Sequence, residues 1–233
     1  SRGRGDVYKR QIPQGLTTSN PYNFSAKFNE TVTLSASKTG YDCTVDGSPI
    51  TVGTANITNA NVVCIPKTYT IGGATDGAVV TATGSSVSNI VAISGGSYSL
   101  SAKLGDVVTL TATKAGYSCY VAGSPITLGA TNITGADVSC TPNTYTVGGT
   151  NPLGASVTIS GSAIPQGLTT SNPYSFSAKF NETVTLSASK TGYDCTVDGS
   201  PMTVGTANIT NANVVCIPKT YTIGGATDGA VVT

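Results

Sequence analysis

Histidine and tryptophan are both absent from this 233-residue sequence, and charged residues make up only 10% of it. Without histidine, the chain lacks the side chain that most often transfers protons or binds metals near neutral pH. No apolar run approaches the roughly 18 residues of a membrane-spanning helix. No signal peptide, sorting motif or initiator methionine is visible, so we expect an internal fragment of a longer protein. This composition differs from that of an ordinary cytosolic enzyme.

What the sequence does contain is a tandem repeat with a period of 76 residues. The segment YSLSAKLGDVVTLTATKAGYSCYVAGSPITLGATNITGADVSCTP (98–142) aligns with the segments 76 residues before and after it, with the same Tyr, Gly and Cys positions. Residues 12–81 recur at 164–233 with two differences, Asn23 for Ser175 and Ile50 for Met202. A repeat of this kind indicates an array of similar folded units.

The repeat divides the chain into modules. Module one (12–67) lacks its opening strands, module two (68–143) and module three (144–219) are complete, and residues 220–233 are the opening strands of a further module. Modules one and three are nearly identical and module two differs from both, so the repeating unit is a 152-residue pair of unlike modules. An unlike neighbour would reduce strand swapping between adjacent modules during folding.

Residues 1–11, SRGRGDVYKRQ, do not fit the repeat, and we expect them to be extraneous or disordered. Their Arg4-Gly5-Asp6 tripeptide is a known type of integrin ligand, but we interpret it here as a chance match. This leader holds four of the 12 basic residues and one of the 11 acidic residues, so the repeats themselves carry a net charge of −2. The sequence therefore predicts no nucleic-acid partner.

Apolar residues alternate with Ser and Thr along most of each module. In module three, for example, Ala155, Val157 and Ile159 alternate with hydroxyl residues. A period of two is typical of antiparallel strands with one buried face. The strands of this module are expected to begin at Tyr145, Ala155, Tyr174, Val184, Tyr193, Met202 and Ala212. The predicted fold class is all-β, an array of antiparallel β-sandwiches with about seven strands per module.

The runs YTIGG, GAVVTATG and YSLSAKLGDVVTLTATKAGYSC, followed at once by another YTVGG, resemble a known group of repeats. They are similar to the carboxypeptidase-regulatory-like, prealbumin-like Ig-type repeats of bacterial surface and secreted proteins. The related collagen-adhesin B-type repeats share this layout, and the resemblance covers each whole module. It implies a seven-stranded Ig-like sandwich that serves as a spacer, stalk or adhesin segment.

Six cysteines occur as one pair per module, with 20 residues between partners: Cys43 and Cys64, Cys119 and Cys140, Cys195 and Cys216. This parity favours one disulfide inside each module. In module three both cysteines are in phase with apolar strand residues, so we expect both to face the core and to join two strands. Buried free thiols and zinc ligation are the alternatives, although the chain has neither His nor C-x-x-C. Disulfides imply an extracellular or cell-surface location.

Other candidate sites are weaker. Asp194 and Asp198 are close together, but module two has Ser118 and Ala122 there, so we interpret them as surface acids rather than as a carboxylate pair or calcium site. Asn-x-Ser/Thr tripeptides begin at Asn23, Asn29, Asn56, Asn132, Asn181 and Asn208. These could accept glycans in a eukaryotic secretory route, or could be ordinary polar strand and turn residues. The sequence predicts no catalytic, cofactor-binding or metal site.

We therefore predict a non-enzymatic protein, a structural spacer, stalk or fibre segment of an extracellular repeat protein of the bacterial adhesin type. The alternatives are a module that binds glycan or protein, and a non-catalytic appendage of a secreted hydrolase. Aromatic residues lie mostly in strands and in phase with the core rather than in turns, which favours the spacer.

The expected partners are the neighbouring modules of the same chain, because only residues 141–144 separate Cys140 from Tyr145. So short a connection predicts a semi-rigid rod. Head-to-tail self-association is a further possibility. Residues 220–233 of one chain could supply the strands that module one of another chain lacks.

Overall fold

The computed structural model describes residues 17–87, 90–92, 96–226, 228–231 and 233. These residues form 19 β-strands and no helix, and every strand pair is antiparallel. The predicted all-β class is therefore confirmed. Within this described part, no helix is long and apolar enough to cross a membrane. The leader 1–11, with Arg4-Gly5-Asp6, lies outside it.

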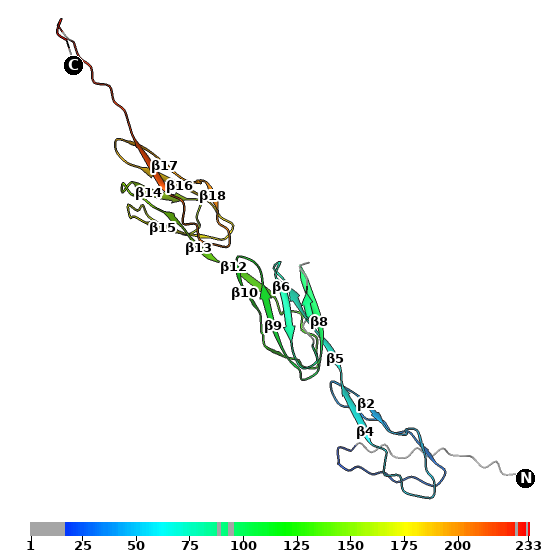
Figure 1. Cartoon of the computed structure of the whole chain (residues 1–233). Helices are drawn as coiled ribbons and strands as arrows, with labels where there is room; N and C mark the ends of the chain where they lie inside the picture. Colours follow the sequence, from blue (N-terminus) through cyan, green and yellow to red (C-terminus); the bar gives the residue numbers. More distant parts are fainter. Residues whose placement is uncertain (1–16, 88–89, 93–95, 227, 232) are drawn as a thin grey trace, which may run out of the picture.

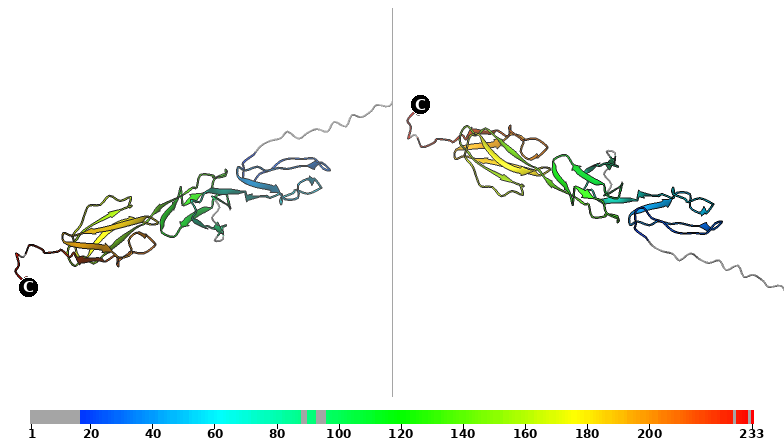
Figure 2. Two further views of the ribbon diagram at one scale, coloured as in Figure 1. Left: turned by 90° about the horizontal axis from the view of Figure 1, so that it is seen from above. Right: turned by 90° about the horizontal axis from the view of Figure 1, so that it is seen from below.

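The chain is elongated, with its modules arranged one after another (Figure 1). Module one lies at one end, module two in the middle and module three at the other end. Two further views show the same arrangement, so it does not arise from the viewing direction (Figure 2). Segment 220–226 and module one are therefore far apart within one chain.

Module three contains the seven strands β13 (Thr144–Gly149), β14 (Ser156–Ser160), β15 (Tyr174–Lys179), β16 (Thr183–Ser189), β17 (Tyr193–Val197), β18 (Met202–Thr203) and β19 (Val214–Pro218). Strand β13 pairs with β15, β14 with β16, β16 with β18, and β17 with β19. Each strand begins within two residues of its predicted start. The largest difference is at β19, which begins at Val214 rather than at Ala212.

The core of module three combines side chains from two sheets. Val147 and Phe176 come from β13 and β15, whereas Val157 and Leu186 come from β14 and β16, and all four are buried in one apolar cluster. The intervening hydroxyl residues along β14 and β16, such as Thr158, face solvent. The predicted inward face of these strands is thus confirmed.

Module two contains β5 (Thr68–Ala74), β6 (Val79–Thr83), β7 (Ile90–Ala92), β8 (Ser97–Lys103), β9 (Val107–Thr113), β10 (Tyr117–Val121), β11 (Ile126–Thr127) and β12 (Val138–Pro142). Strand β5 pairs with β8, and β10 with β12, while β11, β9, β6 and β7 form a four-stranded sheet in that order. The short β7 was not predicted, so this module has eight strands rather than about seven. Its core again includes residues of different sheets, such as Ile71 and Val108.

Module one contains only the strands β1 (Thr31–Val32), β2 (Tyr41–Val45), β3 (Ile50–Thr51) and β4 (Val62–Pro66) in its described part. Residues 22–27, the counterpart of β15, form no strand there. The reason is that β15 pairs with β13 alone, and no described residue of module one supplies that partner. Val45 is the one apolar side chain of residues 17–67 that is buried.

Candidate functional site

Neighbouring modules are joined by a single residue, and this joint is the first candidate site. Lys67 stands alone between β4 and β5, and Asn143 stands alone between β12 and β13. The connection is shorter than the four residues predicted for it. Strands of two consecutive modules therefore follow one another almost without interruption (Figure 1).

Each linking residue is hydrogen-bonded to both modules. The Asn143 N–H donates to the Gly116 carbonyl at 2.9 Å, and the Phe180 N–H donates to the Asn143 carbonyl at 2.8 Å. The first joint repeats this arrangement, because the Lys67 N–H donates to the Gly40 carbonyl at 2.8 Å and the Leu104 N–H donates to the Lys67 carbonyl at 2.9 Å. The backbone of the linker is thus held from both sides.

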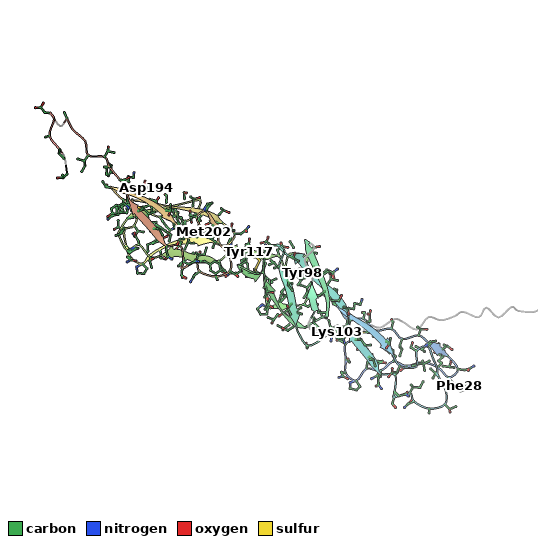
Figure 3. All side chains as sticks on the ribbon, turned by 45° about the horizontal axis from the view of Figure 1, so that its top comes forward. Phe28, Tyr98, Lys103, Tyr117, Asp194 and Met202 are labelled. Atoms are coloured by element: carbon green, nitrogen blue, oxygen red, sulfur yellow. A yellow bond between two sulfur atoms is a disulfide. The ribbon has the colours of Figure 1, made fainter. Side chains whose placement is uncertain are left out.

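An apolar side chain of the later module also packs against a turn of the earlier one. The ring of Phe180 lies 5.4 Å from that of Tyr117, centroid to centroid, in an edge-to-face arrangement. Figure 3 places Tyr117 at this junction. A Cβ on the buried Gly116 would overlap the Phe180 ring, and Gly116 also has φ +79°. Glycine is therefore required here both for its backbone conformation and for the close approach.

At the first joint, Leu104 takes the place of Phe180. A Cβ on Gly40 would lie 2.5 Å from a Leu104 methyl group, and Gly40 has φ +78°. The matching positions Phe28 and Gly192 are not covered by any described residue, since Phe28 is 70% exposed and a Cβ on Gly192 would meet no atom within 4 Å.

The turn that carries Phe180 is closed by a carboxylate. Glu182 accepts backbone hydrogen bonds from Lys179 at 2.8 Å and from Ala163 at 3.0 Å. Burial alone would raise the pKa of this carboxyl, but these backbone donors, together with the Ser162 hydroxyl and the Lys179 charge, lower its pKa overall. The carboxylate form therefore stabilises the turn.

Side-chain pairs beside the linkers differ between the two joints. Lys67 forms an ion pair with Asp42 at 3.3 Å, whereas at the second joint the Ser118 hydroxyl donates to the Asn143 side-chain oxygen at 2.6 Å. The ion pair is exposed, and exposed pairs contribute little to stability. The backbone bonds and apolar packing therefore define the joint.

Each of the three modules also contains one disulfide. The structure pairs Cys43 with Cys64, Cys119 with Cys140 and Cys195 with Cys216, as expected from one pair of cysteines per module. In each pair the two residues are directly opposite on neighbouring strands, β2–β4, β10–β12 and β17–β19. The bridges of modules two and three are half-buried and pack against the cores, so the expected inward orientation holds only in part.

The second candidate site is the channel that receives the first strand of a module, which we call the first-strand slot. In module three it is occupied by β13 and lies between β15 and residues 208–213. The Gly148 N–H donates to the Ile209 carbonyl at 2.8 Å, and the Ala212 N–H donates to the Gly148 carbonyl at 3.0 Å. The slot therefore binds the backbone of its strand on both edges.

Asparagine side chains of the Asn-Ile-Thr segments bind the first strand of their own module. The Asn208 side-chain oxygen accepts from the Thr146 N–H at 2.9 Å, and that of Asn132 accepts from the Thr70 N–H at 3.0 Å. Asn29 and Asn181 instead occupy left-handed turn positions, with φ of 63° and 68°. Asn132 and Asn208 thus lie in loops beside the first strand, and Asn29 and Asn181 lie in turns.

Two adjacent glycines let the first strand enter the slot. A Cβ on Gly149 would lie 2.5 Å from the Ala212 carbonyl oxygen, and one on Gly148 would overlap the Tyr174 carbonyl oxygen. The Tyr174 hydroxyl donates to the same Ala212 carbonyl. Burial, with a smaller contribution from Asp198, raises the pKa of Tyr174. The slot is therefore too narrow for side chains at the Gly-Gly pair.

Tyr98 has the same role in module two, where its hydroxyl donates to the Ala136 carbonyl at 2.5 Å. Burial, assisted by the negative charge of Asp137, raises its pKa to about 12. The hydroxyl therefore remains a hydrogen-bond donor throughout the neutral range.

The remaining predicted positions have simple surroundings. Asp194 forms an exposed ion pair with Lys219 at 3.3 Å, as expected for a surface acid, and Tyr193 is half-buried. No group of His, Cys, Asp or Glu that could hold a metal ion occurs among the described residues. The short connection between modules was expected from the sequence, but the packing of Leu104 and Phe180 against the preceding module was not. The signal for this packing was an apolar residue in a turn that would ordinarily be polar.

No protein-family model, no curated protein and no solved structure matches this chain.

Proposed function

We propose that this chain is a structural spacer, a stalk or fibre segment of an extracellular repeat protein of the bacterial adhesin type. This proposal rests on the one-residue joint between neighbouring modules. A function in separating two objects requires modules that cannot bend freely, and a one-residue linker bonded to both modules restricts bending.

The strength of the joint can be estimated. Two backbone hydrogen bonds contribute roughly 1 kcal/mol each, and the Phe180–Tyr117 pair contributes about another 1 kcal/mol. A bend that breaks all three interactions would cost about 3 kcal/mol, so bent forms would make up on the order of 1% of the population. This value supports a rod rather than a flexible string of modules.

We also propose that each module is an Ig-like β-sandwich of the carboxypeptidase-regulatory-like type. The arrangement of buried side chains supports this, because strands of separate sheets contribute to a single core in modules two and three. The extracellular location is supported by the three disulfides, since such bonds persist mainly in oxidising compartments.

Small-angle X-ray scattering tests the spacer function with a matched pair of variants. Gly116 and Gly192 both have φ +79°, but only a Cβ on Gly116 would meet the Phe180 ring. Both Gly→Ala substitutions therefore strain the backbone equally, and only G116A disturbs the joint. In chains that lack residues 220–233, so that this segment cannot associate, we expect the unsubstituted chain and G192A to scatter as the same rod, and G116A to give a broader range of end-to-end distances. A compact profile for the wild-type chain would rule out the spacer.

A further inference from the structure

The first strand of a module and the segment just before its last strand run side by side in the same direction. In module three the first strand is β13, and residues 208–213 lead into the last strand, β19. A parallel bridge between Val147 and Ile209 joins them, and Ile71 and Ile133 form the matching parallel bridge in module two. Because the two segments are parallel, the chain enters the module at one end of the pair and leaves it at the opposite end.

A pull along the rod would reach this pair directly. Single-residue linkers connect β4 to β5 and β12 to β13, and the joined strands lie end to end (Figure 1). Tension would draw β13 towards module two and β19 away from it. Parallel segments then slide past one another and load all their hydrogen bonds together, whereas an antiparallel pair pulled from adjacent ends breaks its bonds one after another.

Hydrogen bonds hold β13 along both of its edges. On one edge it pairs with β15 throughout its length. On the other edge, four backbone N–H groups donate to carbonyls at 2.8 to 3.0 Å: Ile209 to Thr146, Gly148 to Ile209, Ala212 to Gly148, and Val214 to Thr150. The Asn208 and Asn213 side chains accept two more bonds from this strand and the residue after it, and Asn132 and Asp137 do the same in module two. To slide β13 out of its slot, many bonds must therefore break at the same time.

The disulfide holds the other member of the pair in place. Cys216 of β19 is bridged to Cys195 of β17 and lies two residues before the end of β19 at Pro218. Strand β19 is thus covalently joined to the body of the module and cannot be drawn out by itself. Cys140 of β12 and Cys119 of β10 give module two the same connection. Tension therefore falls on the hydrogen bonds of the first strand.

We propose that modules two and three bear tension along the rod, and that the parallel pair in each module is a clamp loaded in shear. The clamp consists of β13 with residues 208–214 in module three, and of β5 with residues 132–138 in module two. This inference rests on the proposed spacer function, because a spacer that is pulled at both ends is the structure in which such a clamp is used. It adds that the spacer keeps its length under load as well as resisting bending.

Single-molecule stretching of the full chain at constant force can load the clamp of module three in two directions. One handle is fixed at the carboxyl end of the chain. The other is attached either at Thr144, the exposed first residue of β13, or at Leu153, which follows β13 and is 43% exposed. In both arrangements module three is the one complete module between the handles.

A pull from Thr144 loads the clamp in shear, whereas a pull from Leu153 peels it from the end at which the chain leaves the module. The Leu153 carbonyl accepts a hydrogen bond from the Lys190 ammonium at 2.6 Å. Lys190 lies beside this exit, because the nearby Gly192 carbonyl accepts from the Lys219 N–H at 2.8 Å. At equal force, module three should unfold at least roughly tenfold faster when pulled from Leu153, since its bonds then break in succession.

Two variants separate the clamp from ordinary stability. Asn208→Ala removes the side-chain hydrogen bond to Thr146 within the clamp, and Thr158→Val removes the exposed bond to Ser187 between β14 and β16, outside it. Each loses one hydrogen bond, so denaturant unfolding should be affected similarly in both. Under a pull from Thr144, Asn208→Ala should raise the unfolding rate about fivefold, and Thr158→Val should change it by less than about twofold.

Equal unfolding rates in the two pulling directions would overturn the clamp. An equal effect of Asn208→Ala and Thr158→Val would also overturn it, because tension would then not be concentrated on the first strand. Neither result would change the rod seen by small-angle scattering, so failure of the clamp is distinguishable from failure of the spacer function.

Discussion

Modules one and three differ at only two of their shared positions, yet they have different structures. Phe176, Ala178 and Val184 are buried in module three, whereas Phe24 and Ala26 at the corresponding positions of module one are exposed and Val32 is half-buried. The sequence of these segments is therefore not what decides their burial. What differs is the presence of β13 and β14, which precede the shared sequence in module three.

A second comparison leads to the same result. The sequence TYTIGGA forms β5 at residues 68–74, but the same seven residues at 220–226 form no strand. At the first position β8 supplies the pairing partner, and no described residue does so at the second. Backbone hydrogen bonds of a strand are made with another segment, so strand propensity without a neighbour produces no strand.

The largest expected effect comes from giving module one the strands it lacks. When residues 144–163 replace the leader directly before Ile12, residues 22–27 should pair with the added strand. Module stability of about 5 kcal/mol would then protect the Phe24 and Ala26 amides from hydrogen exchange at least roughly a thousandfold. The same graft with its sequence scrambled serves as the control. If hydrogen exchange of these amides is unchanged in the unscrambled graft, the missing strands are not the reason why residues 22–27 form no strand.

Matched truncations in the two modules should have unequal effects. Phe176→Ala removes a buried ring and should destabilise module three by about 3–5 kcal/mol. Phe24→Ala removes a partly exposed ring and should change stability by less than about 0.5 kcal/mol. Denaturant unfolding followed by hydrogen exchange resolves the two modules. Similar losses in both would contradict the comparison.

Removal of the disulfide should also affect modules one and three differently. Cys195 and Cys216 are 21 positions apart, and a loop of this size predicts a loss of about 3 kcal/mol when both are changed to alanine. Module three should remain folded on its core, but the Cys43/Cys64 double variant should lose the β2–β4 pairing, because module one has little other burial.

Thiol titration provides the accompanying check. The denatured, unreduced chain should contain no titratable thiol. Detection of about six thiols would contradict both the bridges and the extracellular location.

The smallest expected effect concerns the tyrosine of the slot. The pKa of Tyr98 is raised to about 12, so its neutral form contributes stability that is complete below pH ~10 and is lost as the pH rises towards 12. Tyr98→Phe removes the hydrogen bond to Ala136, which should cost about 1 kcal/mol, and should abolish this alkaline dependence. Thermal unfolding of both proteins between pH 8 and about 11.5 would show it, and parallel curves would contradict it.

The sequence by itself determined the features that depend on local pattern. The two-residue alternation of Val184 and Leu186 with hydroxyl residues identified which face is buried, and the cysteine parity identified the bridges. The same alternation located the strand starts to within two residues in module three. The alternation follows from the geometry of a single strand, so every copy of the sequence contains it, but burial follows the alternation only where the partner strands are present.

Only the tertiary structure decided which strands form and how modules meet. The loss of the β15 counterpart in module one and the packing of Phe180 on Gly116 both depend on segments far apart in the chain. A hydrogen bond between strands, or a ring against a glycine, needs both partners at one place in space. The alternation pattern of one segment contains no information about whether its partner is present.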